Sequence, residues 1–376
     1  MRFNVPCKAF YNAASAVSKV INSKNSLTIL DNFRISLQDD ILTITGADMD
    51  NELNARIHVT DAEGNCTFCV QARRLVDLLK ELPDSGITFT LNEETYEVEI
   101  RYTGGKYNLT AMNGAEYPVF RSDDDETAPI SFQLSTESLM QGLEYTIFAV
   151  GDDDYRPMMK GVFFDIDEDH ITYVATDTHK LVRFIDNRVS PGVKGSCILP
   201  VKPATVMRNV FAKDENLNFT MTRKSATVES EGFTFRCSFL NGRFPDYNRV
   251  IPKQSPFRLI LDRTAALNAI RRVAVFVDPG YGLEKFKITA DKLHIKSDDN
   301  NMCTCARETI PCSFNGPEMV IGFSAPFLIE FMNVLRTDEV YIDLADPSRA
   351  GVFCPSENTE GTDLVMLLMP MNVDKF

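Results

Sequence analysis

The sequence predicts an α+β chain built from three tandem copies of one domain. Three segments each carry two alternating strands, a turn and a closing aspartate, which is typical of hairpins with one buried face: FRISLQDDILTITGAD, VFFDIDEDHITYVATD and FKITADKLHIKSDD. Each is followed by an apolar strand that runs into a short amphipathic helix. The closing aspartates are separated by 129 and 122 residues: Asp48, Asp177 and Asp299. The same spacings separate three residues of the later strands, so the register is kept: Val70, Leu199 and Ile321.

Each copy is expected to begin with a helix and to follow the order helix, strands, helix, strands. In the first helix, apolar residues recur at the spacing of one buried stripe: Phe10, Ala13, Ala14, Val17, Val20 and Ile21. Ser135 and Asp262 are the predicted N-caps of the equivalent helices. Polar or proline-rich linkers are expected at 121–129 and 251–256. The predicted domains are 1–122, 129–250 and 256–376.

The bulk properties indicate a reduced, cytoplasmic, globular protein. The 376 residues are 44% hydrophobic and carry a formal charge of −14, with no apolar run of the roughly 20 residues that a membrane span needs. The N-terminus lacks the continuous apolar core of a signal peptide. Nine cysteines, an odd number, fit reduced core thiols better than a disulfide framework. The acidic charge alone disfavours nucleic acid as a partner, although it does not tell where the cations lie.

No set of residues for catalysis, cofactor binding or metal binding is expected. The four histidines lack metal-ligand spacing, and no phosphate-binding glycine motif opens a helix. Cys66-x-x-Cys69 and Cys303-x-Cys305 suggest zinc but have no matching second pair, so buried thiols are favoured. Asp152, Asp153 and Asp154 leave open a carboxylate-dependent hydrolase, although a solvated loop fits them better. A repeat scaffold that binds proteins but no DNA is the other alternative.

Three separated motifs resemble the bacterial DNA polymerase III beta subunit family, the beta sliding clamps: ATDTHKLVRF (175–184), NGRFPDYNRVIP (241–252) and LLMPM (367–371). The threefold layout is similar along the whole chain. The resemblance implies three DNA-clamp domains, each with two helices on two antiparallel sheets, in a head-to-tail homodimer that closes into a ring around duplex DNA. It also implies a processivity factor that is not an enzyme and that binds DNA polymerase subunits, the clamp loader and repair proteins through short peptides.

The resemblance further implies where partners bind. The peptide pocket would comprise Met159, Thr176, Thr178, His179, Lys180, Leu181, Pro245, Arg249, Val250, Leu367, Leu368, Met369, Pro370 and Met371. Ordinary core packing is the alternative for its apolar members. Three features depart from the family: Thr178 stands where glycine is usual, Lys180 where arginine is common, and the chain continues through 373–376. A bulkier Thr178 and a longer tail are expected to narrow the pocket or to shift its peptide preference.

Cations on the helices are expected to face the DNA, where phosphate contacts give sequence-independent binding. The candidates are Lys8, Lys19, Lys24, Arg73, Arg74, Arg156, Lys202, Arg208, Arg271 and Arg272. A merely solvated side chain is the alternative for each. By the same resemblance, the dimer contact would pair Tyr107 and Leu109 of one copy with Val275 and Phe276 of the other, with packing inside the domain as the alternative.

Overall fold

The chain forms two compact units. The computed structural model describes residues 1–118, 120, 128–212, 216–252, 254–278, 280, 282–299, 302–373 and 376. One unit comprises residues 1–137 and 202–239, and the other comprises residues 138–201 and 240–376, so the central copy of the repeat contributes to both. No helix within the described ranges combines the length and the apolar character needed to cross a membrane.

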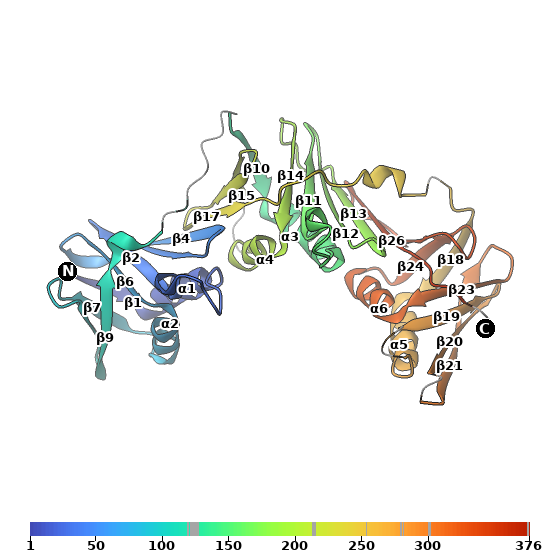
Figure 1. The fold of residues 1–376 in the computed structure, drawn as a ribbon, viewed down its shortest axis with the longest axis horizontal. Coiled ribbons are helices and arrows are strands. Elements are labelled where there is room, and N and C mark those ends of the chain that lie inside the picture. Colours follow the sequence, from blue (N-terminus) through green and yellow to red (C-terminus); the bar gives the residue numbers. More distant parts are fainter. Residues whose placement is uncertain are drawn as a thin grey trace. The chain divides into compact units, whose positions relative to one another are not determined.

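The three copies share one order of elements, as the repeat predicts (Figure 1). The N-terminal copy contains β1 (Arg2–Pro6), α1 (Cys7–Ser18), β2 (Asn32–Gln38), β3 (Ile41–Ala47), β4 (Asn51–His58), β5 (Thr60–Glu63), β6 (Cys66–Gln71), α2 (Ala72–Glu81), β7 (Gly86–Leu91), β8 (Glu97–Tyr102) and β9 (Gly105–Asn113). The central copy contains β10 (Ile130–Ser135), α3 (Thr136–Thr146), β11 (Gly161–Ile166), β12 (Ile171–Thr176), β13 (Lys180–Asp186), β14 (Gly195–Pro200), α4 (Val201–Val210), β15 (Asn216–Met221), β16 (Ser225–Glu229) and β17 (Phe233–Ser238). The C-terminal copy contains β18 (Phe257–Asp262), α5 (Arg263–Ala274), β19 (Leu283–Ile288), β20 (Lys292–Asp299), β21 (Thr304–Pro311), β22 (Ser313–Phe314), β23 (Met319–Ser324), α6 (Ala325–Val334), β24 (Glu339–Leu344), β25 (Gly351–Pro355) and β26 (Thr362–Leu368). The α+β class with two helices in each copy is confirmed.

Each copy begins with a strand, so the prediction that it begins with a helix was wrong. In β1, Phe3 and Val5 are buried while the residues beside them are more exposed, and the helix follows at once. These strands are short, and the strong helical periodicity that follows hides their alternation. The predicted cap at Asp262 is confirmed, because its carboxylate accepts a hydrogen bond from Ala265 N at 2.7 Å. Ser135 ends β10, directly before α3.

The N-terminal core forms between helices and sheet as the apolar stripe predicts. The α1 residues of the stripe are buried: Phe10, Ala13, Ala14 and Val17. The Phe10 ring meets the edge of Phe89 at 6.2 Å, and Phe3 stacks on Phe89 at 5.0 Å between ring centroids. Such aromatic pairs add about 0.5–1.5 kcal/mol each beyond the burial of their area.

Strands of successive copies pair edge to edge, and this contact is called the strand junction below. In the first unit, β4 pairs antiparallel with β17, which joins the strands of the N-terminal copy to those of the central copy in one sheet. In the second unit, β13 pairs in the same way with β26. One backbone hydrogen bond recurs at both: Ser238 N donates to Asp50 O at 2.9 Å, and Met369 N donates to His179 O at 2.8 Å. The two junctions are therefore equivalent in detail.

The C-terminal segment (364–373) leaves its sheet at the end of β26. Leu364 and Met366 of β26 lie buried in the sheet. After Pro370 the chain crosses to β23, where Met371 N donates to Gly322 O at 2.8 Å. A Cβ atom at Gly322 would lie 2.5 Å from the Val373 side chain, so this crossing requires glycine. The end of the chain is thus held against β23 at least as far as residue 373.

Candidate partner-binding pocket

An apolar cavity of about 220 Å³ lies in the second unit. Its lining is Met159, Thr176, Thr178, His179, Lys180, Leu181, Phe244, Pro245, Tyr247, Val250, Leu367 and Met369. Ten of the fourteen predicted pocket residues are among them. Cavities that hold a drug-sized ligand are usually about 300–1,000 Å³. This smaller one suits a few apolar side chains of a peptide.

Strand pairing brings the distant motifs together. Leu181 of β13 is the register partner of Leu367 of β26, so both point to the same face of the sheet. The hydrogen bond from Met369 N to His179 O then fixes the chain beyond β26 against the turn between β12 and β13. The remaining motif, NGRFPDYNRVIP, contributes Pro245 and Val250, which line the same cavity.

Four predicted members lie outside the lining. Leu368 is only 1% exposed and belongs to the core. Pro370 precedes the crossing and Met371 bridges to Gly322 of β23, and neither residue is part of the lining. Arg249 ends a short 3-10 helix (Tyr247–Arg249), and its exposed side chain pairs with Asp246 at 2.8 Å. The structure does not place these four residues in the cavity wall, and their part in partner binding stays a prediction.

Phe244 and Tyr247 line the cavity and were not predicted. Phe244 stacks on Phe163 with ring centroids 4.7 Å apart. Tyr247 donates a hydrogen bond from its hydroxyl to Asp165 Oδ2 at 2.9 Å, and burial together with this carboxylate raises its pKa to about 12. Both residues are inside the NGRFPDYNRVIP motif, and their aromatic character was the available signal. Their aromatic rings line the cavity together with the methionine side chains of Met159 and Met369.

Lys180 contributes its stem to the cavity but not its charge. Its ammonium lies 2.5 Å from Glu330 Oε2 on α6 and 4.2 Å from the centroid of the Phe327 ring, and the side chain is 5% exposed. The Glu330 side chain is 40% exposed, but its removal would take a close anionic partner from the buried Lys180 ammonium, which is costly. Lys180 therefore ties the pocket to α6 instead of offering a cation to a ligand.

Thr178 adopts a left-handed backbone conformation at the mouth of the pocket, with φ of +79°. A β-branched residue is strained there, at a cost of about 1–2 kcal/mol. The turn is held by Asp177 Oδ1, which accepts hydrogen bonds from the backbone N–H groups of His179 and Lys180 at 2.9 and 2.8 Å. The departure from glycine at this position thus strains the turn, and the expected narrowing of the cavity stays a prediction.

Replacing Thr178 with glycine is expected to relieve this strain. Thr178→Ala is the matched variant, because it also removes the Oγ1 and Cγ2 atoms but keeps the Cβ atom at positive φ. We expect Thr178→Gly to be about 1 kcal/mol more stable than Thr178→Ala in urea unfolding. Equal stability of the two variants would contradict the strain. Both variants are expected to enlarge the pocket alike, so a difference in peptide affinity between them reports on the turn and not on bulk.

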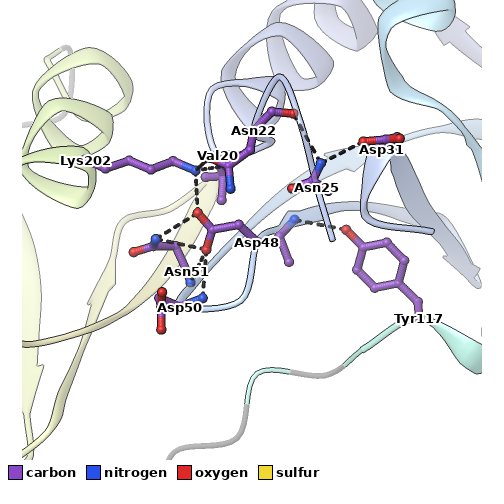
Figure 2. A network of polar contacts seen from close by, with 10 residues as sticks. Val20, Asn22, Asn25, Asp31, Asp48, Asp50, Asn51, Tyr117 and Lys202 are labelled. Carbon is purple, nitrogen blue, oxygen red and sulfur yellow. Dashed lines mark hydrogen bonds and ion pairs between the residues drawn. The ribbon is translucent and has the colours of Figure 1, made fainter. Parts of the chain in front are cut away.

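Lys202 was predicted to face DNA, and the structure gives its ammonium other partners. It donates to the carbonyl of Val20, to Asn22 Oδ1 and to Asp48 Oδ2, all from the N-terminal copy (Figure 2). Asp48 in turn accepts hydrogen bonds through Oδ1 from Asp50 N and Asn51 N at 2.8 and 2.7 Å. Lys202 therefore ties the central copy to the N-terminal copy at the first strand junction, and its contact with DNA stays a prediction.

The remaining predicted cations differ in how firmly they are held. Arg272 pairs with Glu308, and Arg271 donates to Asn333 Oδ1 at 2.8 Å. Arg156 lies 3.9 Å from Asp153 and Arg73 lies 3.8 Å from Asp77, so these contacts are weak. Lys19 donates to the carbonyl of Asn209 at 3.2 Å. Four others are exposed and make no ion pair within the described ranges: Lys8, Lys24, Arg74 and Arg208.

The carboxylate run that raised the hydrolase alternative surrounds a lysine. Lys160 Nζ lies 2.5 Å from Asp154 Oδ1 and 3.4 Å from Asp152 Oδ1. Hydrogen bonding to Lys160 lowers the pKa of Asp154, the direction opposite to that of a general acid. Asp153 turns away and caps its own loop, where Oδ1 accepts from Tyr155 N at 2.9 Å. The cluster is a solvated loop with an ion pair.

The predicted dimer residues are unusually exposed for apolar side chains. Val275 is 77% exposed, Phe276 40% and Tyr107 37%, whereas Leu109 is half-buried. Val275 and Phe276 directly follow α5, and Tyr107 and Leu109 occupy alternate positions of β9. Exposed apolar side chains on both elements fit a contact with another protein surface.

Comparison with known proteins agrees along the whole chain. Models of the DNA polymerase III beta subunit match as N-terminal domain at 1–121, central domain at 133–246 and C-terminal domain at 248–372. The beta sliding clamps of Haemophilus influenzae and Escherichia coli are each 24% identical, over 375 and 374 residues, covering 99% of this chain and 100% of the relative. Two solved structures share the fold with TM-scores of 0.92 and cover 99% of this chain and 100% of theirs. These are a Pseudomonas aeruginosa sliding clamp bound to griselimycin, 22% identical, and the Streptococcus pyogenes beta subunit, 20% identical.

The threefold α+β repeat, its strand junctions and the matching folds define a DNA clamp. More narrowly, the chain belongs to the DNA polymerase III beta subunit family. Its function is accordingly that of a sliding clamp, a processivity factor that is not an enzyme.

Proposed function

We propose that two copies of this chain close head to tail into a ring around duplex DNA and tether a DNA polymerase to it in the cytoplasm. One observation supports the ring: the strand junction occurs twice within the chain, and its two strands have one further equivalent each, β21 and β9. Residues 105–110 of β9 pair with β8, and only 111–113 pair with β6, so the second edge of 105–110 has no neighbouring strand within the described ranges. β21 is equivalent to β4 and β13, and within the described ranges it is the end strand of its sheet. β9 is equivalent to β17 and β26. A third junction needs β21 of one copy and β9 of another, and the reciprocal contact closes the ring.

The internal junctions also give the register of this third one. Asn51 pairs with Cys237 and Lys180 with Leu368. The hairpin β12–β13 is equivalent to the hairpin β20–β21. Thr176 pairs with Leu181 in the first and Asp298 with Cys305 in the second, so Leu181 is equivalent to Cys305. Lys180 is then equivalent to Thr304. The Asn-Gly landmark aligns Cys237 with Leu109. Leu109 of one copy is therefore proposed to face Thr304 of the other, which places Asn108 opposite Cys305.

Asn108→Cys is expected to form a disulfide with the native Cys305 of a second copy. Both positions are exposed and point away from the helices in the proposed ladder, so directly opposed residues lie within disulfide reach. Mild oxidation should give a covalent dimer on a non-reducing gel. Adding Cys305→Ser is the control and should abolish it. A dimer unaffected by Cys305→Ser would refute the register, and the absence of any dimer in solution would refute the ring.

The pocket supports capture of short linear peptides from the polymerase, the clamp loader and repair proteins. Its wall combines flexible Met159 and Met369 with apolar Leu181, Leu367 and Val250. Thioether side chains adapt to different apolar anchors, which suits a surface that several partners share. The described cavity contains no free cation, because Lys180 is bound to Glu330. Affinity is therefore proposed to come from apolar anchors of the peptide.

Non-specific DNA binding is supported by cations on the helices and on two loops. The most available of the predicted set are Lys8, Lys24, Arg74 and Arg208. Contacts of this kind neutralise phosphates without reading bases, so they permit sliding and weaken with salt. A scaffold that binds proteins but no DNA would lack this salt-dependent retention.

A further inference from the structure

The Lys202 contact at the first strand junction predicts an ionic contact at the dimer junction. Lys202 is the second residue of α4, and its ammonium binds three acceptors of the neighbouring copy. Asp48 ends the hairpin strand before the junction, while Val20 and Asn22 follow the end of α1 (Figure 2). Each of these positions has an equivalent in the elements that would meet in the dimer.

The equivalent of Lys202 is Arg73. It is likewise the second residue of its helix, α2, and it follows an equivalent strand at the repeat spacing of 129 residues. Its side chain is 92% exposed, and its recorded ion pair, with Asp77, is 3.8 Å long. A guanidinium this exposed and this weakly paired is available to another molecule.

The equivalent of Asp48 is Asp299. Each ends the second strand of the repeated hairpin, and each carboxylate accepts a hydrogen bond from the backbone of the turn that follows. Asp48 Oδ1 accepts from Asn51 N at 2.7 Å, and Asp299 Oδ1 accepts from Met302 N at 3.0 Å. The same local bond therefore holds both carboxylates at the equivalent place beside the hairpin turn.

The equivalent of Asn22 is Asp278. Both helices end in the same pair of backbone bonds: Val20 N to Val17 O and Ile21 N to Ser18 O after α1, and Phe276 N to Val273 O and Val277 N to Ala274 O after α5. This alignment places Phe276 where Val20 stands and Asp278 where Asn22 stands. A carboxylate thus replaces the amide, and the second acceptor becomes anionic.

We propose that Arg73 of one copy binds Asp299 and Asp278 of the second copy and locks the dimer junction. The inference rests on the proposed ring. Lys202 faces one carboxylate and one amide, whereas Arg73 faces two carboxylates, and the planar fork of five N–H donors in guanidinium suits two carboxylates better than an ammonium does. Arg73 accordingly serves dimer closure and not DNA, although it lies on a helix with cations assigned to DNA.

The second internal junction shows that the position is not obligatory. The second residue of α6 is Pro326, which has no charge. At this junction the cation is Lys180 of the hairpin and the anion is Glu330 of the helix. Within the described residues, each internal junction therefore contains an ion pair between a hairpin region and a helix. The cation lies on the helix at the first junction and in the hairpin at the second. Differing pairs prevent one junction from substituting for another, which favours the correct partner over a wrong one.

The test is a double-mutant cycle on dimer dissociation, measured by sedimentation equilibrium without DNA. Arg73→Glu and Asp278→Arg are each expected to raise the dissociation constant of the dimer at least about tenfold, since each places like charges together at both dimer junctions of the ring. The combined variant should recover at least about tenfold relative to the product of the two single effects. Arg208→Glu makes the same charge change on α4 and should leave the constant unchanged.

The outcomes separate this inference from the proposed ring. A wild-type dimer whose dissociation constant responds no more to Arg73→Glu than to Arg208→Glu would overturn the lock and keep the ring. Independent effects of Arg73→Glu and Asp278→Arg would also overturn it. A wild type that stays monomeric at every concentration would overturn both. Arg73→Gln, which removes the charge without reversing it, should weaken the dimer less than Arg73→Glu and in the same direction.

Discussion

Replacing Met369 with glutamate is expected to reduce the affinity for the C-terminal peptide of the cognate polymerase at least about 100-fold, or roughly 3 kcal/mol. Met369 lines the cavity and is 44% exposed, so the free protein tolerates the change. A bound peptide would cover the new carboxylate. The cavity offers it no free cation within the described residues, because Lys180 is engaged by Glu330. The buried, unpaired charge opposes binding.

The matched control for this variant is Met112→Glu. Met112 is 45% exposed and lies on β9, away from the cavity lining. Isothermal titration of the peptide should show wild-type affinity for Met112→Glu and no measurable binding for Met369→Glu. Equal affinity of the two variants would remove the cavity as the peptide site. A point change is sharper than truncation after Met366, which would also remove Leu367 and Leu368 from their pairing with β13.

Glu284→Gln is expected to stabilise the protein, and more so as the pH rises. Glu284 lies in β19 with Phe286 and Ile288 on its buried face, and it is 0% exposed. Neither carboxylate oxygen has a hydrogen-bond partner in the described part of the chain. Burial without a partner raises the pKa of Glu284 from 4.5 to about 9. The folded protein therefore holds a neutral carboxyl at neutral pH.

The sign follows from which state holds the proton. Between the unfolded pKa of 4.5 and the folded pKa of about 9, the folded state keeps a proton that the unfolded state releases, so stability falls as pH rises through this window. The loss is roughly 1 kcal/mol at pH 5.5 and roughly 5 kcal/mol at pH 8.5. Glutamine keeps the shape and does not titrate. The advantage of Glu284→Gln in urea unfolding should grow accordingly.

The control for the titration is Glu360→Gln, which changes an exposed glutamate in a loop of the same unit. It should change the free energy of unfolding by little at either pH. A constant difference between wild type and Glu284→Gln across this range would show that the carboxyl is ionised in the folded state. It would then require a cationic partner that the described residues do not contain.

The repeated fold could be predicted from the sequence because hairpins and helices leave periodic patterns that recur at a fixed spacing. The pocket could be anticipated from three motifs that are far apart in sequence. The directions of the Arg249 and Leu368 side chains could not be predicted, since they depend on a 3-10 turn and on strand register. The tie formed by Lys202 and the buried Glu284 also left no signal, because charge in a sequence gives no sign of its neighbours after folding.

The most direct test of the ring is retention on circular against linear DNA. The dimer would be loaded by the cognate clamp loader onto a nicked circular plasmid and followed by gel filtration in salt high enough to weaken phosphate contacts. A topological link predicts that the protein stays with the circular plasmid and is lost once the plasmid is cut by a restriction enzyme. Equal loss from circular and linear DNA, or equal retention on both, would contradict a clamp that encircles the duplex.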